Sequence, residues 1–236
     1  EVPSEGAPVG IFLTGSDDVT FAGNTIEGTA FGIFPNSGAS DTEIESNTLR
    51  GQDTAIFLSG SDDESIQSNT FKNNTRHLRD FDTKPDLQEL VADNTFDRVV
   101  TIEDDAGNLN SSSIFGAIQP AVDEASPGDT VNASSGIYNE SVEISTPNVT
   151  VSGQHDLFNG IEGTVIEGRV SLTAPETEIR ETKIAPPTFA DDPDGGNAIN
   201  VTASNVVSAV NVTASGAVVD DSTINITSVA SDGELR

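Results

Sequence analysis

The sequence contains no cysteine, no methionine and no tryptophan, and it has only two histidines, His77 and His155. Without cysteine there is no disulfide, no thiol nucleophile and no thiolate metal site. Two histidines are too few for a histidine-rich metal cluster. No apolar run reaches the roughly 18 residues that a membrane-spanning helix needs, so we expect no direct span in this segment. The chain therefore lacks the residues that thiol chemistry requires and the apolar run that a membrane-spanning helix requires.

Basic residues are also scarce, because 10 Lys and Arg stand against 39 Asp and Glu, for a formal charge of −29. Such a surface repels the phosphates of nucleic acids and of anionic membranes, so neither is an expected partner. Disorder is a common reason for acidic sequences, but the regular recurrence of Val, Ile, Leu and Phe argues against it. Screening over roughly 3 Å at 1 M salt removes most self-repulsion, which favours a folded protein of a halophile.

An internal repeat organises the first hundred residues. Asn-Thr-apolar tripeptides recur at spacings of 23, 22 and 25 residues, beginning at Asn24, Asn47, Asn69 and Asn94. Chance would give about 0.3 such tripeptides in this composition. A column of apolar residues has spacings of 22, 23 and 22, at Ile11, Ile33, Ile56 and Leu78. The two columns share one period and indicate stacked structural repeats.

The repeat predicts an all-β right-handed parallel β-helix. Its period is too short for a propeller blade, and the Leu-x-x-Leu-x-Leu frame of leucine-rich repeats is missing. The apolar segments are short, β-branched or aromatic, and Gly, Ser, Asn and Asp separate them. Each coil would supply three strands and lie about 4.8 Å above the previous coil. We expect the four repeated Asn side chains to form a structural hydrogen-bond ladder rather than to act in catalysis.

After Phe96 the pattern changes. An apolar stripe follows Ser111–Ser113 and predicts a short amphipathic capping helix near 113–125, with Ser as its N-cap. Pro120 is expected to kink or restart that helix. Such a helix would cover the open end of a new stack of coils. We therefore expect two stacks in tandem: residues 1–98 hold the C-terminal coils of a first β-helix, and residues 99–236 hold the N-terminal cap and coils of a second.

Three segments carry a resemblance to a known family. Residues 118–131 resemble the N-terminal capping segment of pectate-lyase-like β-helix domains, and residues 136–142 and 164–168 look like the first coils of those domains. With its acidic, Lys-poor composition, the chain is similar to tandem β-helix regions of haloarchaeal cell-surface proteins. The resemblance implies an extracellular or cell-surface location. It implies no single activity, because this fold carries many. Because residues 9–12 begin in the middle of a coil and nothing after Ile226 resembles a cap, we also expect a longer native polypeptide.

Enzymes with this fold act on acidic polysaccharides, which sets a test for the sequence. Pectate-lyase-type elimination needs acidic residues that hold Ca²⁺ and an exposed basic residue, and polygalacturonase-type hydrolysis needs paired Asp with Gly-His-Gly and Arg-Ile-Lys segments. The chain offers the pairs Asp17-Asp18 and Asp62-Asp63 but neither of the other two segments. No acid/base pairing is readable from the basic residues. We therefore assign no catalytic residue.

Two sets of aspartates are candidate ligands for Ca²⁺ or another cation, and no other cofactor is expected. A Gly-bearing segment resembles part of a Ca²⁺ loop and contributes Asp191, Asp192 and Asp194. A column that follows the coil period contributes Asp18, Asp41, Asp63 and Asp86. Stacked carboxylates would lie about 4.8 Å apart and repel, which salt or a bound cation would offset. The alternative for both sets is that Asp is a favoured, solvated turn residue.

Eight Asn-x-Ser/Thr sequons are present, where about four would be expected by chance. They begin at Asn73, Asn110, Asn132, Asn139, Asn148, Asn200, Asn211 and Asn225. In several of them strand alternation turns a β-branched residue inward, so that Asn and Thr face solvent together. The pattern fits N-glycosylation, and it fits ordinary polar-out strand patterning equally well.

Two classes of function remain. The favoured one is an extracellular structural or adhesive surface scaffold of a halophile, N-glycosylated, with carbohydrate, other surface proteins or further copies of the chain as partners. The alternative is a polysaccharide-active lyase or hydrolase, or a carbohydrate-binding β-helix. One Tyr and no Trp weaken sugar stacking, which favours the scaffold.

Overall fold

The computed structural model describes residues 6–36, 38–61, 64–80, 86–109, 112–154 and 163–184, together with the backbone of 199–201 and 224–226. No helix within these ranges is long and apolar enough to cross a membrane. The chain forms two compact units. Unit 1 comprises Glu1–Val99 with Ser111–Ala117, and unit 2 comprises Val100–Asn110 with Ile118–Arg236. Short parallel strands are stacked coil upon coil in both, so the predicted right-handed parallel β-helix is confirmed.

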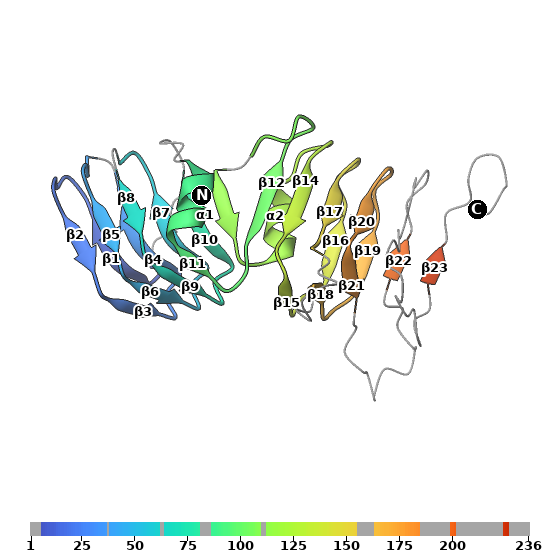
Figure 1. Ribbon diagram of the computed structural model, residues 1–236, viewed down its shortest axis with the longest axis horizontal. Coiled ribbons are helices and arrows are strands. Elements are labelled where there is room, and N and C mark those ends of the chain that lie inside the picture. Colours follow the sequence, from blue (N-terminus) through green and yellow to red (C-terminus); the bar gives the residue numbers. More distant parts are fainter. Residues whose placement is uncertain are drawn as a thin grey trace. The chain divides into compact units, whose positions relative to one another are not determined.

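Unit 1 has three parallel sheets, one for each side of the coil (Figure 1). The first contains β1 (Val9–Leu13), β4 (Phe31–Pro35), β7 (Thr54–Leu58) and β10 (Arg76–Asp80). The second contains β2 (Thr20–Ala22), β5 (Glu43–Glu45) and β8 (Ser65–Gln67). The third contains β3 (Thr25–Glu27), β6 (Thr48–Arg50), β9 (Thr70–Lys72) and β11 (Thr95–Phe96). Residues one coil apart are therefore neighbours across a strand pair.

The fourth coil of unit 1 departs from the repeat. Between β10 and β11 the chain forms α1 (Leu87–Asp93) in place of a strand of the second sheet. Asp86 is the N-cap of α1, and its carboxylate accepts the backbone N–H groups of Gln88 and Glu89 at 2.9 and 3.2 Å. On the first sheet, β13 (Ser113–Phe115) pairs antiparallel with β10.

Left-handed backbone at fixed places turns the chain from one strand to the next. One corner column has φ of 67°, 56° and 58°, at Gly23, Ser46 and Ser68. A second has φ of 63°, 68° and 51°, at Gly28, Gly51 and Asn73. This backbone disfavours residues with a Cβ by roughly 1–2 kcal/mol, so Gly and small polar residues occupy the corners. The corners repeat because each coil must turn in the same place as its neighbour.

The four repeated Asn residues form a hydrogen-bond ladder along the stack. Each amide nitrogen donates to the amide oxygen one coil further on, at 3.0 Å from Asn24 to Asn47, 3.1 Å from Asn47 to Asn69 and 3.0 Å from Asn69 to Asn94. The same oxygens accept the backbone N–H of the preceding Asn, each at 2.9 Å. Nδ2 of Asn69 also donates to the carbonyl of Ile44 at 2.7 Å. These amides satisfy buried backbone groups that the turn leaves without a strand partner.

A second, shorter ladder stands at the corner after the third sheet. The amide oxygen of Asn74 accepts the backbone N–H of Gln52 at 2.9 Å, and its amide nitrogen donates to the carbonyl of Leu49 at 3.0 Å. Gln52 in turn donates to the carbonyl of Ile26 at 2.8 Å. Both side chains are buried. The orientation of the Asn74 amide is fixed, because one bond needs its oxygen and the other its nitrogen.

Unit 2 repeats the three-sided arrangement with coils of less regular length. Its first sheet contains β14 (Thr130–Ala133), β17 (Thr150–Ser152) and β20 (Glu178–Arg180), with β12 (Val100–Glu103) antiparallel to β14. The others are β15 (Gly136–Tyr138), β18 (Thr164–Ile166) and β21 (Thr182–Ile184), and β16 (Val142–Ile144), β19 (Val170–Leu172), β22 (Ile199–Val201) and β23 (Ile224–Ile226). The core is apolar and includes Val131, Ile144, Val151, Ile166 and Leu172.

The capping helix is present but begins later than expected. It is α2 (Ile118–Glu124), and Ser113 belongs to β13, so the predicted serine N-cap is wrong. The carboxylate of Glu140 takes over that role and accepts the N–H groups of Ile118 and Gln119 at 2.7 and 2.9 Å. Pro120 lies in the first turn, where no intrahelical N–H bond is needed, so the expected kink has no cause. Within unit 2, α2 packs against β12, β14 and β16.

We predict that Asn69→Ala lowers the free energy of unfolding of unit 1 by roughly 2–3 kcal/mol, because it leaves buried carbonyl and amide groups without partners. Asn24→Ala is the matched control. Asn24 is an exposed member of the same ladder, so its loss should cost less than about 1 kcal/mol. Urea unfolding of the two variants at constant high salt measures the difference. Equal losses would contradict a ladder whose strength depends on burial.

Candidate functional site

The aspartates proposed as cation ligands fall in different settings. Asp18 and Asp41 are exposed and occupy equivalent left-handed corners of adjacent coils, with φ of 56° and 50°. The residues before them, Asp17 and Ser40, are paired across these coils. Asp86 instead caps α1. The remaining candidates lie outside the described residues: Asp63, Asp191, Asp192 and Asp194. Among the residues that were placed, no group of three or more His, Cys, Asp or Glu side chains could hold a metal ion.

The sequons also differ in setting. Three asparagines are exposed, namely Asn73, Asn139 and Asn148. Asn132 is half-buried in β14, where Thr101 of β12 and Ser152 of β17 flank it. Two more are paired in register across β22 and β23, at Asn200 and Asn225. Asn110 and Asn211 lie outside the described residues.

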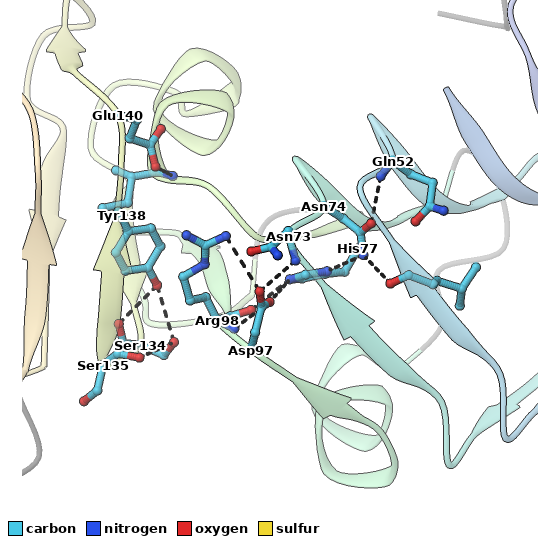
Figure 2. Close-up of polar contacts among 12 residues, drawn as sticks. Gln52, Asn73, Asn74, His77, Asp97, Arg98, Ser134, Ser135, Tyr138 and Glu140 are labelled. Carbon is cyan, nitrogen blue, oxygen red and sulfur yellow. Dashed lines mark hydrogen bonds and ion pairs between the residues drawn. The ribbon is translucent and has the colours of Figure 1, made fainter. Parts of the chain in front are cut away.

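His77, to which the sequence interpretation gave no role, is a fully enclosed polar group of unit 1. His77 lies in β10, and its side chain has 0% exposure. Its ring packs edge-on against Phe71 and at an angle against Phe96, with centroids 5.6 and 5.1 Å away. These two phenyl rings are themselves stacked, 4.8 Å apart. Figure 2 shows the imidazole between Asn74 on one side and Asp97 and Arg98 on the other.

The hydrogen bonds of His77 determine its tautomer. Its Nδ1 lies 3.3 Å from Nδ2 of Asn74, and the two anchoring bonds of Asn74 leave a hydrogen on that nitrogen for the imidazole. Nδ1 must therefore accept. Nε2 lies 2.8 Å from the carbonyl oxygen of Arg98, to which it can only donate. The geometry thus selects a neutral imidazole with its proton on Nε2.

Burial lowers the pKa of His77 to about 4, although the nearby carboxylate of Asp97 and the Arg98 carbonyl act to raise it. The Asp97 Oδ1 lies 3.7 Å from Nε2, but with the pKa depressed this is not an ion pair at neutral pH. Asp97 has other partners. Its carboxylate accepts the backbone N–H groups of Asn73 and Arg98 at 2.7 and 2.9 Å and lies 3.7 Å from the Arg98 guanidinium.

The His77 site is closed rather than reactive. A Cβ placed on Gly116 would lie 2.7 Å from Nε2 and 2.9 Å from Cε1 of the ring, so the backbone at Gly116 covers this edge. Both ring nitrogens are already hydrogen-bonded. A general base needs a free lone pair within reach of a substrate, and this imidazole presents none. Its chemistry is therefore that of a satisfied core group.

Unit 2 also has a buried ring whose polar atom is hydrogen-bonded, namely Tyr138. Tyr138 is fully buried, and its hydroxyl donates to the carbonyl of Ser134 at 3.1 Å (Figure 2).

Two side chains attach α2 to the rest of unit 2. The side chain of Gln119 forms two hydrogen bonds with the backbone of Glu143, accepting its N–H at 2.6 Å and donating to its carbonyl at 3.3 Å. With Glu140, this amide attaches α2 to the adjoining coil.

A sequence signal for the burial of His77 exists in its spacing. His77 follows Gly10, Gly32 and Ala55 at intervals of 22, 23 and 22 residues. That column points into the coil, because a Cβ on Gly32 would lie 2.8 Å from Cδ2 of Leu49. The polar character of His77 conceals its place in an otherwise small and apolar column. Its partner Asn74 lies at a corner that follows the coil period, one coil after Gln52, whereas Arg98 contributes only a backbone carbonyl, which no residue type marks.

One family model matches the chain. It is described as "Periplasmic copper-binding protein (NosD)", and it matches residues 3–115, just under half of the sequence and mainly those of unit 1. No curated protein and no solved structure matches the chain. The resemblance to pectate-lyase-like and haloarchaeal proteins stays a prediction.

We predict that His77 makes folding stability pH-dependent on the acidic side. Its pKa of about 4 in the folded protein lies below its ordinary value of 6.5, so the unfolded state binds a proton first as pH falls. The associated stability is present above about pH 6.5 and is lost between 6.5 and 4, by about 3 kcal/mol in total.

Thermal unfolding at intervals across that window, at constant salt, measures the slope. His77→Gln should flatten the curve relative to the parent whatever its absolute stability, because Gln does not titrate. The carboxylates are the same in both proteins, so parallel curves would show that His77 does not contribute.

Proposed function

We propose that this chain forms part of an extracellular scaffold of a halophile, in which stacked coils present a regular, hydrophilic and glycosylated surface. The observation that carries this proposal is the difference between the side chains that point into the coils and those that face solvent. The hydrogen-bonding atoms of inward polar groups such as Asn69, Asn74 and His77 take part in bonds that hold the coils together. Their placement supports a structural rather than a reactive role for the interior.

The outward columns are polar and evenly spaced. On the third sheet of unit 1, strand pairing aligns one threonine per coil, at Thr25, Thr48, Thr70 and Thr95. In the first three of these coils a charged residue is aligned as well, at Glu27, Arg50 and Lys72, and all three are exposed. Glu27 and Arg50 form an exposed ion pair at 2.7 Å. Such a face suits repeated weak contacts with a hydrated polymer or a neighbouring surface protein better than a single deep site.

Two further observations support the proposed location and environment. The match to a family described as periplasmic supports export across the cytoplasmic membrane. A formal charge of −29 supports a saline environment, because screening there offsets the repulsion between carboxylates. Polygalacturonase-type hydrolysis gains no such support, since the one histidine in the described ranges is fully buried.

Glycosylation is the modification that this surface is best placed to accept. Asn148 is exposed at a left-handed corner, with φ of 57°, and the middle residue of its sequon, Val149, is fully buried. Asn73 has the same arrangement, with φ of 51° and a buried Asn74. A glycan at either corner would project into solvent without disturbing a strand pair.

To test the scaffold proposal, we would treat intact cells of the source organism with a protease in their native salt and follow the chain with an antibody against unit 1. We expect labelling of intact cells from outside, and its loss on brief proteolysis. A cytoplasmic protein is the control and should survive. Labelling that requires lysis would contradict the proposal, and so would release of reducing or unsaturated ends from uronic-acid polymers by the purified chain.

Glycopeptide analysis of material from the source organism tests the modification. We expect glycans on Asn73, Asn139 and Asn148, and none on Asn132, which is half-buried within a central strand. Asn132 is thus an internal control on the same chain. If every one of these four asparagines is unmodified, the sequons reflect strand patterning alone.

A further inference from the structure

We infer that His77 is not a copper ligand, although a family described as copper-binding matches the part of the chain that contains it, and that its imidazole instead fastens the last coil of unit 1 as a structural hydrogen-bonding group. The inference rests on the donor atoms that the chain offers and on the contacts that surround the ring.

The chain has a poor donor set for copper. Cu(I) prefers thiolate and thioether sulfur, and the sequence has neither Cys nor Met. Cu(II) favours a planar set of nitrogen and oxygen donors, for which imidazole is the characteristic protein nitrogen. Only His77 and His155 could supply imidazoles, and His155 lies outside the described residues. In the ranges that the structure covers, His77 has no group of acidic or histidine side chains around it that could complete a metal site.

Coordination through Nδ1 would break the second ladder. The Nδ1 lone pair accepts from Asn74, whose amide is anchored to the Gln52 N–H and the Leu49 carbonyl. A metal at Nδ1 would have to displace this amide. Two buried backbone groups of the adjoining coil, the Gln52 N–H and the Leu49 carbonyl, would then lose their partner, which is unfavourable because a buried donor or acceptor without a partner has lost its hydration uncompensated.

Coordination through Nε2 is closed by backbone. Nε2 faces the Arg98 carbonyl at 2.8 Å, and the chain at Gly116 lies against the same edge of the ring. A metal–imidazole bond needs about 2 Å in the ring plane, with further space for the other ligands. The side chain has 0% exposure, so solvent offers no alternative route to this nitrogen.

The same contacts show what His77 does. It occupies the column of Gly10, Gly32 and Ala55, but in the last coil. There it ties β10, through Nε2, to Arg98, which follows β11 on the third sheet. Phe71 and Phe96 hold the ring on its other sides. The charged groups facing it are Asp97 and Arg98, and both have partners of their own. The imidazole thus joins two sides of the coil where the repeat ends.

Copper titration of the full chain, at high salt and pH 7, tests the inference with Cu(II) sulfate and, separately, with Cu(I) under anaerobic conditions. The variants are His77→Gln and His155→Gln, the latter as the matched control. We expect the Kd of His77→Gln for copper to lie within twofold of that of the parent, or, if the parent does not bind copper, that His77→Gln does not bind it either. In metal-free buffer His77→Gln should lower the midpoint of thermal unfolding by several degrees. Loss of a saturable one-equivalent site in His77→Gln, but not in His155→Gln, would overturn the inference.

Nuclear magnetic resonance of the parent protein keeps the test decisive even if His77→Gln fails to fold. We expect imidazole nitrogen shifts of His77 that report the Nε2-protonated tautomer, unchanged by substoichiometric Cu(II). Selective broadening or loss of the His77 ring signals on adding Cu(II) would show coordination and refute the structural assignment.

Discussion

The structure depends on one constraint, which is that every coil must hydrogen-bond to the next at the same positions. No coil can bury its inner face alone, and each strand is completed only by the coils above and below it. The choice of residue at a position is therefore constrained more by the equivalent positions in the neighbouring coils than by the local segment. The Asn ladder follows directly, because a corner that recurs every 22 or 23 residues leaves the same backbone groups unpaired in each coil.

The same constraint also determines the sizes of the side chains that face each other in the interior. Where the first sheet of unit 1 carries Gly10, Gly32 and Ala55, the third sheet carries the larger Ile26, Leu49 and Phe71. A side chain at Gly32 would collide with Leu49, so the small column and the large column are complementary. Where the repeat ends, the small column gives way to His77, whose ring fills the available space and bonds at both nitrogens. At this position the imidazole thus combines bulk with hydrogen bonds to two different turns.

Periodic features of this fold were readable from the sequence, and singular ones were not. The columns of Ile11 and Asn24 predicted the strands and their register because each position recurs several times. Ser113 was wrongly expected to cap the helix because its local context is that of an N-cap, whereas the actual cap, Glu140, lies 22 residues beyond Ile118. The partnership of His77 with Arg98 was equally unreadable, since Arg98 contributes a carbonyl that any residue could provide. Periodicity carries information about columns, whereas single long-range contacts depend on the finished fold.

The amide-to-amide bonds of the Asn ladder have one direction, since in each of them the amide nitrogen donates to the amide oxygen of the next Asn toward the C-terminus. For this reason, the stack of coils in unit 1 can be lengthened or shortened only by whole coils. Removing or adding one whole coil would return each column to its place and leave donors facing acceptors. A deletion of a few residues inside a strand would move all later side chains out of their columns, while the same change in a loop outside the corners would move none. Sequence drift in such a protein should therefore proceed by duplication of entire coils and by loop insertion, of which the segment between β10 and β11 is one example.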